Sequence, residues 1–418
     1  MRRIGKSLLN KKHICLRIVP FTQIQELILV GFNSYSMAKK LSNLNAMLEK
    51  FNATMGEGVI HTASELPKCR KVLSTIPAYN YVTDGGFPIG RVIEHYGENG
   101  SLKSYTAYDA IAQFQHYDWA NHEQNAFKSF EYSGTGAVRE LDSYELRRGY
   151  KPKKEPIARR VALVDIEATY TPDWGEKFGI DNEGLILIRP TLLTEAVDIV
   201  QALLIDESIS LIVFDSLSAI GTDDEVEKSM EDQQMASGAR FWNKACRKFQ
   251  SAMNGNPHQE ATLLVINSAY QKTGIAYGDP EVIRNGEQLK RTKTLSVKFK
   301  ALKKINGKTD EGDIAVGRNI SIECIKNKTG ANGRNATFFY AFTDYANIEA
   351  YHTDTTGQIV DLGMKFGLVE RKGAWYSYED VRVSGMNSFT EELENTGKIR
   401  ELEQEVYDEM SNNSDDDD

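Results

Sequence analysis

The sequence predicts an α/β protein with a mostly parallel central sheet. Three short apolar runs, at 161–164, 211–214 and 262–266, are rich in Val, Ile and Leu. Such runs are typical of strands that are buried on both faces. Helical apolar spacing at 193–204 and 239–253 separates them. Strands that alternate with helices imply βαβ units, in which ligands bind at the carboxyl ends of the strands.

The first 36 residues differ in composition from the rest of the chain. Residues 1–20 hold six Lys and Arg and no acid, and a short apolar patch follows at 27–32. The patch is short for the hydrophobic region of a signal peptide. We therefore interpret residues 1–36 as an upstream extension of the reading frame, with a targeting segment as the alternative. From Met37 onward, helical apolar spacing continues to Phe51.

The stretch 85–104 has the layout of a phosphate-binding loop. An apolar strand at 91–96 leads into small residues, and Lys103 and Ser104 then open a helix. In such a loop, backbone N–H groups at a helix N-terminus surround phosphate groups. The pattern G-x-x-x-x-G-K-[ST] is broken because Leu102 stands where the second glycine belongs. We expect the Leu102 side chain to reshape the loop or to require a negative φ.

Polar side chains stand just beyond the apolar runs. Glu167, Asp215 and Ser268 each follow one of the three predicted strands. A carboxylate directly after a strand beside a phosphate loop suits Mg²⁺ and its waters, so we expect Ser104 and Asp215 to hold the metal. Glu167 is placed to orient or deprotonate an attacking water. Each residue alone could be a helix cap or a solvated acid, but together with Lys103 they favour a nucleotide site.

Composition and charge set the remaining bounds. The length of 418 residues suits about two or three domains, and no apolar run approaches the roughly 18 residues that span a membrane. We therefore expect no membrane partner. The four cysteines show no metal spacing, which favours reduced thiols in a cytoplasmic protein. They are Cys15, Cys69, Cys246 and Cys324.

Net charge separates the C-terminal end from the body. Segment 390–418 carries twelve acids and two bases, a balance of −10, whereas the whole chain has −9, so residues 1–389 sum to +1. We interpret residues 411–418 as an acidic disordered tail. It is either a solvated end or a segment that competes with a polyanion for the basic surface of the protein.

From Met37 to about Asn387, the chain resembles the RecA family of recombinases. The stretches that carry the resemblance are GGFPIGRVIEHYG, VALVDIEATYTPDW, LIVFDSLSAI, IKNKTG and GQIVDLGMKFGLVERKGAWYSY. The resemblance implies a RecA-like P-loop ATPase core at 76–345, preceded by an N-terminal polymerisation segment of helix plus strand at 37–75. It also implies a small α+β C-terminal domain at 346–410. The departures from the family pattern suggest a phage-type member.

About forty residues, at about 117–156, separate the phosphate-loop helix from the next strand beyond what the family pattern needs, and we interpret them as an insertion. A surface loop is the default interpretation, and an additional contact to nucleic acid or to a partner is the alternative.

The resemblance further implies that ATP binds between adjacent protomers of a helical filament. Lys103 and Glu167 would be catalytic, and Lys326 and Lys328 would reach the γ-phosphate from the neighbouring protomer. For these two lysines an exposed basic turn is the alternative. Ser268 replaces a glutamine that senses the γ-phosphate and relays the ATP state to the second DNA loop. With the shorter serine, this relay would be weaker, pass through water or use Asn267. The implied ATP-binding residues are Gly97, Glu98, Asn99, Gly100, Ser101, Leu102, Lys103, Ser104, Trp174 (stacked on adenine), Asp215 and Ser268.

Two loops, at 227–236 and 269–284, match those with which the family binds DNA. Aromatic insertion together with phosphate contacts binds single strands with little sequence preference. Segment 290–304 adds seven Lys and Arg and no acid, which is either a phosphate-binding surface or a solvated basic face. The implied DNA-binding residues are Met235, Arg240, Arg247, Lys272, Gly274, Ile275, Tyr277, Gly278, Arg284 and Lys290.

The resemblance thus implies a DNA-dependent ATPase that forms filaments on single-stranded DNA and exchanges strands with double-stranded DNA. Its cofactors would be ATP and Mg²⁺. Its partners would be DNA, further copies of itself and, as candidates, mediator and single-strand-binding proteins. One alternative is a filament protein that uses ATP mainly as an assembly switch. A RecA-core helicase is a weaker one, because the second DNA loop and the GAWYSY stretch argue against it.

Overall fold

The structure is a computed structural model, and it describes residues 46–47, 49–50, 69–119, 130–132, 139–141, 159–217, 237–256, 258–271, 281–283, 286–309, 312–346 and 348–415. The chain divides into two units, 1–68 and 69–418, and the fold below is that of the second. The predicted extension at 1–36 lies outside the described residues. So do nearly all of 37–68 and most of the insertion at 117–156.

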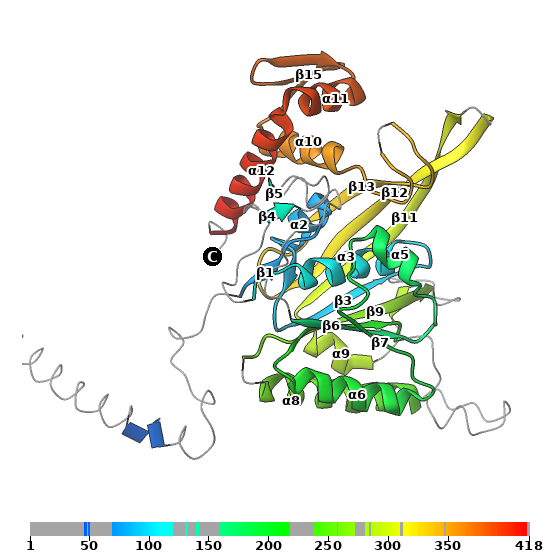
Figure 1. The fold of residues 1–418 in the computed structure, drawn as a ribbon, viewed down its shortest axis with the longest axis vertical. Coiled ribbons are helices and arrows are strands. Elements are labelled where there is room, and N and C mark those ends of the chain that lie inside the picture. The colour runs from blue at the N-terminus through cyan, green and yellow to red at the C-terminus, as the bar shows by residue number, and fades with distance from the viewer. Residues whose placement is uncertain are drawn as a thin grey trace, which may run out of the picture. The chain divides into compact units, whose positions relative to one another are not determined.

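Within the described residues, nine strands form the central sheet (Figure 1). Their order is β13-β12-β11-β3-β9-β8-β6-β7, and β10 pairs with β9. Strands β11, β3, β9, β8, β6 and β7 run parallel to one another, whereas β12, β13 and β10 pair antiparallel, which confirms the mostly parallel sheet. The strands are β3 (Val92–Gly97), β6 (Arg160–Asp165), β7 (Leu185–Ile188), β8 (Ile209–Asp215), β9 (Thr262–Gln271), β10 (Glu281–Ile283), β11 (Leu295–Thr309), β12 (Gly312–Asn327) and β13 (Asn335–Ala341).

Helices cover both faces of the parallel strands, with α3 on one face and α6 and α8 on the other (Figure 1). Successive strand residues point to opposite faces. Leu163, Val213 and Leu264 therefore share a core with α3, while Val164, Phe214 and Val265 share a core with α6 and α8. The helices of this part are α2 (Pro77–Thr83), α3 (Lys103–Gln115), α5 (Pro172–Lys177), α6 (Leu193–Ile205), α8 (Ser237–Gly255) and α9 (Gly286–Thr292).

The predicted elements of the core are confirmed. The runs at 161–164, 211–214 and 262–266 lie within β6, β8 and β9, and the periodic segments form α6 and α8. The unit boundary lies before Cys69, so residues 69–75 of the expected polymerisation segment pack with the core. Their strand β1 (Lys71–Val72) pairs with β2 (Phe87–Pro88). In the insertion, β4 (Phe130–Tyr132) pairs with β5 (Arg139–Leu141).

The C-terminal part is α+β, as expected. An antiparallel sheet of β14 (Glu370–Lys372), β15 (Trp375–Tyr378) and β16 (Val381–Ser384) accompanies α10 (Thr355–Phe366), α11 (Met386–Thr396) and α12 (Lys398–Asp415). Side-chain hydrogen bonds join this part to α2. The backbone N–H of Ala78 donates to Gln358 Oε1 at 3.0 Å, and Asn80 Nδ2 donates to the Tyr407 hydroxyl at 2.8 Å.

The prediction of a disordered tail from residue 411 is wrong for its first five residues. Helix α12 continues to Asp415, because Val406, Tyr407 and Met410 are buried in the core and fix its last turns. The Ser411 hydroxyl also donates to the Tyr407 carbonyl at 2.9 Å. Among the described helices, none is long and apolar enough to cross a membrane.

The packing of α12 gives a stability prediction. Leu402 is fully buried between α12 and α10, so Leu402→Ala should lower the free energy of unfolding by about 2–5 kcal/mol. The control is Glu401→Ala on the exposed side of α12, with an expected change within about 0.5 kcal/mol. Urea denaturation measures both. Equal midpoints would contradict the packing of α12 against the core.

Candidate active site

The phosphate-loop stretch joins β3 to α3, at the carboxyl edge of the sheet. Gly97 ends β3 at φ 152°, and a Cβ there would lie 2.0 Å from the carbonyl oxygen of Phe299 on β11. Only glycine fits so close to the neighbouring strand. Lys103 is buried, and its ammonium donates to the carbonyls of Gly97 at 3.1 Å and Glu98 at 2.7 Å. Burial lowers the pKa of Lys103, and the Asp215 and Glu167 carboxylates oppose that shift.

Leu102 keeps the backbone that a glycine would have. Its φ is 69° and its ψ 25°, in the left-handed region, directly before α3. The expectation that Leu102 needs a negative φ is therefore wrong, because this residue adopts a positive φ. A left-handed non-glycine residue costs roughly 1–2 kcal/mol. Partial burial of the side chain against the core offsets this cost, and the Leu102 carbonyl accepts the backbone N–H of Thr106 at 3.1 Å.

The two predicted metal ligands meet. The Ser104 hydroxyl donates to Asp215 Oδ2 at 2.7 Å, linking the start of α3 to the end of β8. Asp215 is buried, and burial raises its pKa to about 6, with Glu167 and Asp165 adding to the shift. Within the described residues, no group of three His, Cys, Asp or Glu could hold a metal ion by itself. A hydroxyl with one carboxylate suits Mg²⁺ that keeps waters and phosphate oxygens in its shell.

The carboxylates after β6 have different environments. Glu167 is exposed and accepts the Ser216 hydroxyl at 3.0 Å, which places it beside Asp215 at the sheet edge. Asp165 is buried and bonds Arg189 at 3.0 Å and the backbone N–H of Tyr170 at 3.1 Å. Glu167 is therefore open to a substrate, and Asp165 stabilises the turn that carries it.

An aromatic surface lies on α5. The Trp174 ring meets Phe178 at 5.5 Å and Tyr351 at 5.2 Å between centroids, both edge to face. The Lys177 ammonium lies over both Trp174 and Tyr351, at 5.4 and 4.9 Å. A partly exposed ring of this kind can stack on a purine. No sequence motif pointed to Tyr351, which lies far along the chain from Trp174.

Arg318 is a further residue that sequence reasoning missed. It reaches the loop from β12 and donates to the Gly100 carbonyl at 3.4 Å. In the described part of the chain, its buried Nε and the hydroxyl of Thr343 have no hydrogen-bond partner. The Arg318 guanidinium thus lies beside the loop at Gly100.

A buried polar network lies below the loop. The Asn267 side chain accepts the Ser268 backbone N–H at 3.0 Å and donates to Glu94 Oε1 at 3.1 Å. The other oxygen of Glu94 forms an ion pair with Lys293 and accepts the Ser296 hydroxyl at 2.9 Å. The network therefore links β9, β3 and β11. Sequence reasoning named Asn267 but missed Glu94 and Lys293, which are 199 residues apart.

Two family models match the chain. The RecA N-terminal domain matches residues 153–345, and the RecA C-terminal domain matches residues 357–411. Together the matches span more than half of the chain. The chain belongs to the RecA family.

Curated relatives extend the likeness across the phosphate loop. Protein RecA of Nocardia farcinica is 25% identical over 384 residues, which are 90% of this chain and 94% of the relative. Protein RecA of Bacillus subtilis is 26% identical over 83% of this chain and 85% of the relative, and that of Streptomyces avermitilis is 28% identical over 80% and 76%. These identities mark a divergent RecA-family member. The crystal structure of the RadB recombinase covers 67% of this chain and all of its own, at a TM-score of 0.42 and 15% identity, a likeness too weak to argue from.

In this RecA-family protein, Lys326 and Lys328 lie at the end of β12, against α9. The Lys326 ammonium donates to the Lys290 carbonyl at 2.6 Å, and that of Lys328 to the Arg291 carbonyl at 3.3 Å. Burial lowers the pKa of Lys326, and the positive charges of Lys328 and Lys293 add to the shift. Both lysines are therefore bound to α9 instead of to the phosphate loop of their own protomer.

Three of the expected DNA-binding residues can be placed. Arg240 and Arg247 are exposed on α8, and Lys290 is exposed on α9. The two helices pack together, and the backbone N–H of Gln288 donates to Asn243 Oδ1 at 3.1 Å. The other expected residues lie outside the described residues. They are Met235, Lys272, Gly274, Ile275, Tyr277, Gly278 and Arg284.

The Glu94 network gives a second stability prediction. Glu94→Ala leaves the Lys293 ammonium buried without its carboxylate, so the free energy of unfolding should fall by about 3–5 kcal/mol. The control is Asp198→Ala, which breaks the exposed ion pair with Lys248 and should cost at most about 1 kcal/mol. Thermal and urea unfolding measure both. Similar losses in the two variants would show that Glu94 is not the buried partner of Lys293.

Proposed function

We propose that this RecA-family recombinase is a DNA-dependent ATPase that forms helical filaments on single-stranded DNA and catalyses homologous pairing and strand exchange. The observation that carries the proposal is the hydrogen bond of Ser104 to Asp215, with Lys103 and Glu167 beside it. This set combines a cation for phosphate, a metal-binding pair and a carboxylate for water. The names of the curated relatives support the recombinase role.

In the proposed reaction, each residue of this set has one task. Lys103 would exchange the loop carbonyls for the β- and γ-phosphates, and Ser104 and Asp215 would hold Mg²⁺. Bound Mg²⁺ supplies positive charge that neutralises the phosphate oxygens. Glu167, held by the Ser216 hydroxyl, orients the attacking water towards the γ-phosphate. Trp174 offers its partly exposed ring to the adenine.

A neighbouring protomer would complete the site. Lys326 and Lys328 repel each other on an accessible surface, and a phosphate from another copy would relieve that repulsion. Cations inserted in this way stabilise the transferring phosphoryl group and make turnover depend on assembly. Such a head-to-tail contact between unlike faces generates a helical filament when it does not close into a ring.

The DNA surface would run along α8, α9 and the second loop. Arg240, Arg247 and Lys290 provide exposed positive charge on the two packed helices. The second loop joins β9 to β10, whose ends pair at Gln271 and Glu281. A basic surface of this kind binds phosphates without sequence preference and weakens with added salt.

Turnover tests the proposal. The native protein should hydrolyse ATP, faster with single-stranded DNA, whereas Lys103→Ala and Glu167→Gln should each lose about 10²-fold or more. The control is Lys372→Ala, which breaks an exposed ion pair with Glu370 on β14 and should keep native rates. Phosphate release with and without DNA, and electron microscopy of filaments, are the measurements. Filaments without DNA-stimulated turnover would instead favour ATP as an assembly switch.

The raised pKa of Asp215 gives a pH dependence. With a pKa of about 6, the carboxyl is mostly ionised at pH 7.5 and mostly protonated at pH 5. A protonated carboxyl cannot bind Mg²⁺, so the affinity for Mg²⁺ with a non-hydrolysable ATP analogue should fall about tenfold over this range. Calorimetric titration at several pH values measures it. Asp215→Asn should bind weakly throughout and show only the titration of the nucleotide, and equal pH slopes would count against this role.

A further inference from the structure

A tight turn at 327–334 follows β12. Lys326 directly precedes this turn, and Lys328 lies within it. Asn327, which lies between the two lysines, is buried. Its Nδ2 donates to the Thr83 carbonyl at 3.0 Å, and its Oδ1 accepts the backbone N–H and the hydroxyl of Thr329, at 2.9 and 2.8 Å. The residue between the lysines is thereby tied both to its own turn and to the end of α2.

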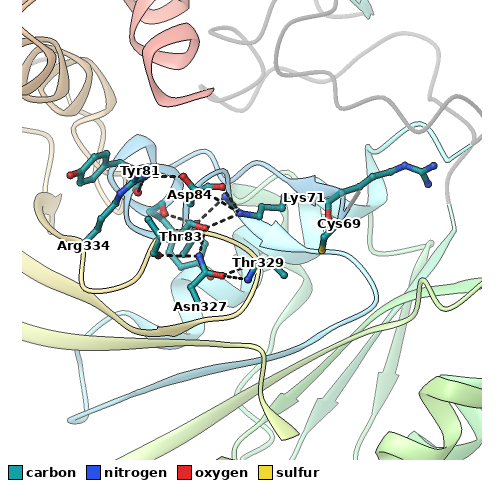
Figure 2. A network of polar contacts seen from close by, with 12 residues as sticks. Cys69, Lys71, Tyr81, Thr83, Asp84, Asn327, Thr329 and Arg334 are labelled. Carbon is teal, nitrogen blue, oxygen red and sulfur yellow. Dashed lines mark hydrogen bonds and ion pairs between the residues drawn. The ribbon is translucent and has the colours of Figure 1, made fainter. Parts of the chain in front are cut away.

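The end of α2 holds the turn through Asp84 (Figure 2). Asp84 caps α2 in the left-handed region, at φ 60°, and its side chain is 7% exposed. One oxygen bonds Arg334 Nη1 at 2.9 Å, and the other lies 3.6 Å from the Lys71 ammonium. Lys71 also donates to the carbonyls of Thr83 at 3.3 Å and Asp84 at 2.5 Å. The Asp84 carboxylate therefore faces the positive charges of both Arg334 and Lys71.

The turn lies directly on this carboxylate. A Cβ on Gly330 would come within 2.1 Å of Asp84 Oδ2, so only glycine fits there without a shift. The Arg334 guanidinium lies 5.3 Å from the centroid of the Tyr81 ring and donates to the Tyr81 carbonyl at 3.4 Å. Arg334 thus joins the end of the turn to α2 through an ion pair, a hydrogen bond and a cation–π contact.

We propose that Asp84, Arg334 and Asn327 are positioning residues that hold Lys326 and Lys328 for the active site of the neighbouring protomer. This inference rests on the proposed function. Long lysine side chains have high rotamer entropy, so the backbone that bears them must be fixed if they are to meet a γ-phosphate. The backbone N–H of Lys328 donates to the Thr294 carbonyl at 3.0 Å, and the Asp84 network fixes the other side of the turn.

Loss of the Asp84 network differs in its effect from loss of ordinary core packing. The network belongs to the face that donates the lysines, so its loss damages the site of the next protomer and spares the protomer's own Lys103, Ser104 and Asp215. Arg334→Ala is therefore defective in trans, whereas Lys103→Ala is defective in cis. Mixing the two variants forms some interfaces in which both halves are intact.

The test is a complementation experiment with the full chain. Arg334→Ala alone should bind Mg²⁺ with the ATP analogue as the native protein does and lose tenfold or more of its DNA-stimulated hydrolysis. An equal mixture with Lys103→Ala should recover about a quarter of native activity, because random mixing makes about one interface in four complete. Arg334→Lys, which keeps the charge facing Asp84, should retain more activity than Arg334→Ala.

Arg159→Ala is the matched control. Arg159 bonds Glu260 at 2.7 Å, lies 4.8 Å from the Trp119 centroid and is 18% exposed, against 15% for Arg334. Glu260 keeps Arg70 as a second cation, as Asp84 keeps Lys71. Native activity in Arg334→Ala would overturn the inference. So would a loss that mixing with Lys103→Ala does not restore, or a loss that Arg159→Ala shares.

Amide hydrogen exchange gives a readout that does not need turnover. Arg334→Ala should speed exchange in peptides covering 326–334, and Arg159→Ala should not. If the native protein has no DNA-stimulated hydrolysis, the proposed function fails, and exchange alone decides whether the network fixes the turn. Unchanged exchange in Arg334→Ala would overturn the inference even where turnover is normal.

Discussion

The buried ion pair of Glu94 with Lys293 is the interaction on which the sheet edge beside the phosphate loop depends. It lies on β3, directly before the phosphate loop, where β11 and β9 flank it in parallel register at Ser296 and Val265. A buried charge is costly unless it is paired and hydrogen-bonded, and Glu94 has Lys293, Ser296 and Asn267 as partners. These contacts help to hold β3, β9 and β11 in register, so that the carboxyl ends of the three strands lie at one edge of the sheet.

The chemistry gathers at that edge because parallel strands bring their carboxyl ends together. Asp215 meets Ser104 there, and Glu167 meets Ser216. The backbone of the phosphate loop absorbs the change from glycine to Leu102, because partial burial of the leucine side chain offsets the left-handed strain. The departure from the family pattern is thus accommodated locally, and the residues proposed to bind phosphate and metal lie together.

The proposed assembly uses two unlike half-sites of one molecule. One would be the phosphate loop with Ser104 and Asp215, and the other would be the turn with Lys326 and Lys328, which bonds to α9 and rests on Asp84. Two unlike faces on one protomer are what a head-to-tail assembly requires. Each half-site has its own buried polar anchor, Glu94 for the first and Asp84 for the second. Substitutions at Glu94 and at Asp84 should therefore affect different halves of the proposed site.

The sequence by itself determined the core elements and pointed to most residues of the proposed nucleotide site. Apolar runs define β6, β8 and β9 because strands buried on both faces need continuous hydrophobic residues, and the loop pattern identifies Lys103 and Ser104. Only the tertiary structure decided the conformation of Leu102, the continuation of α12 to Asp415, and the polar anchors. The partners Glu94 and Lys293 are 199 residues apart, and Asp84 and Arg334 are 250 apart. Such pairs have no local periodicity or spacing, because the fold alone brings them into contact.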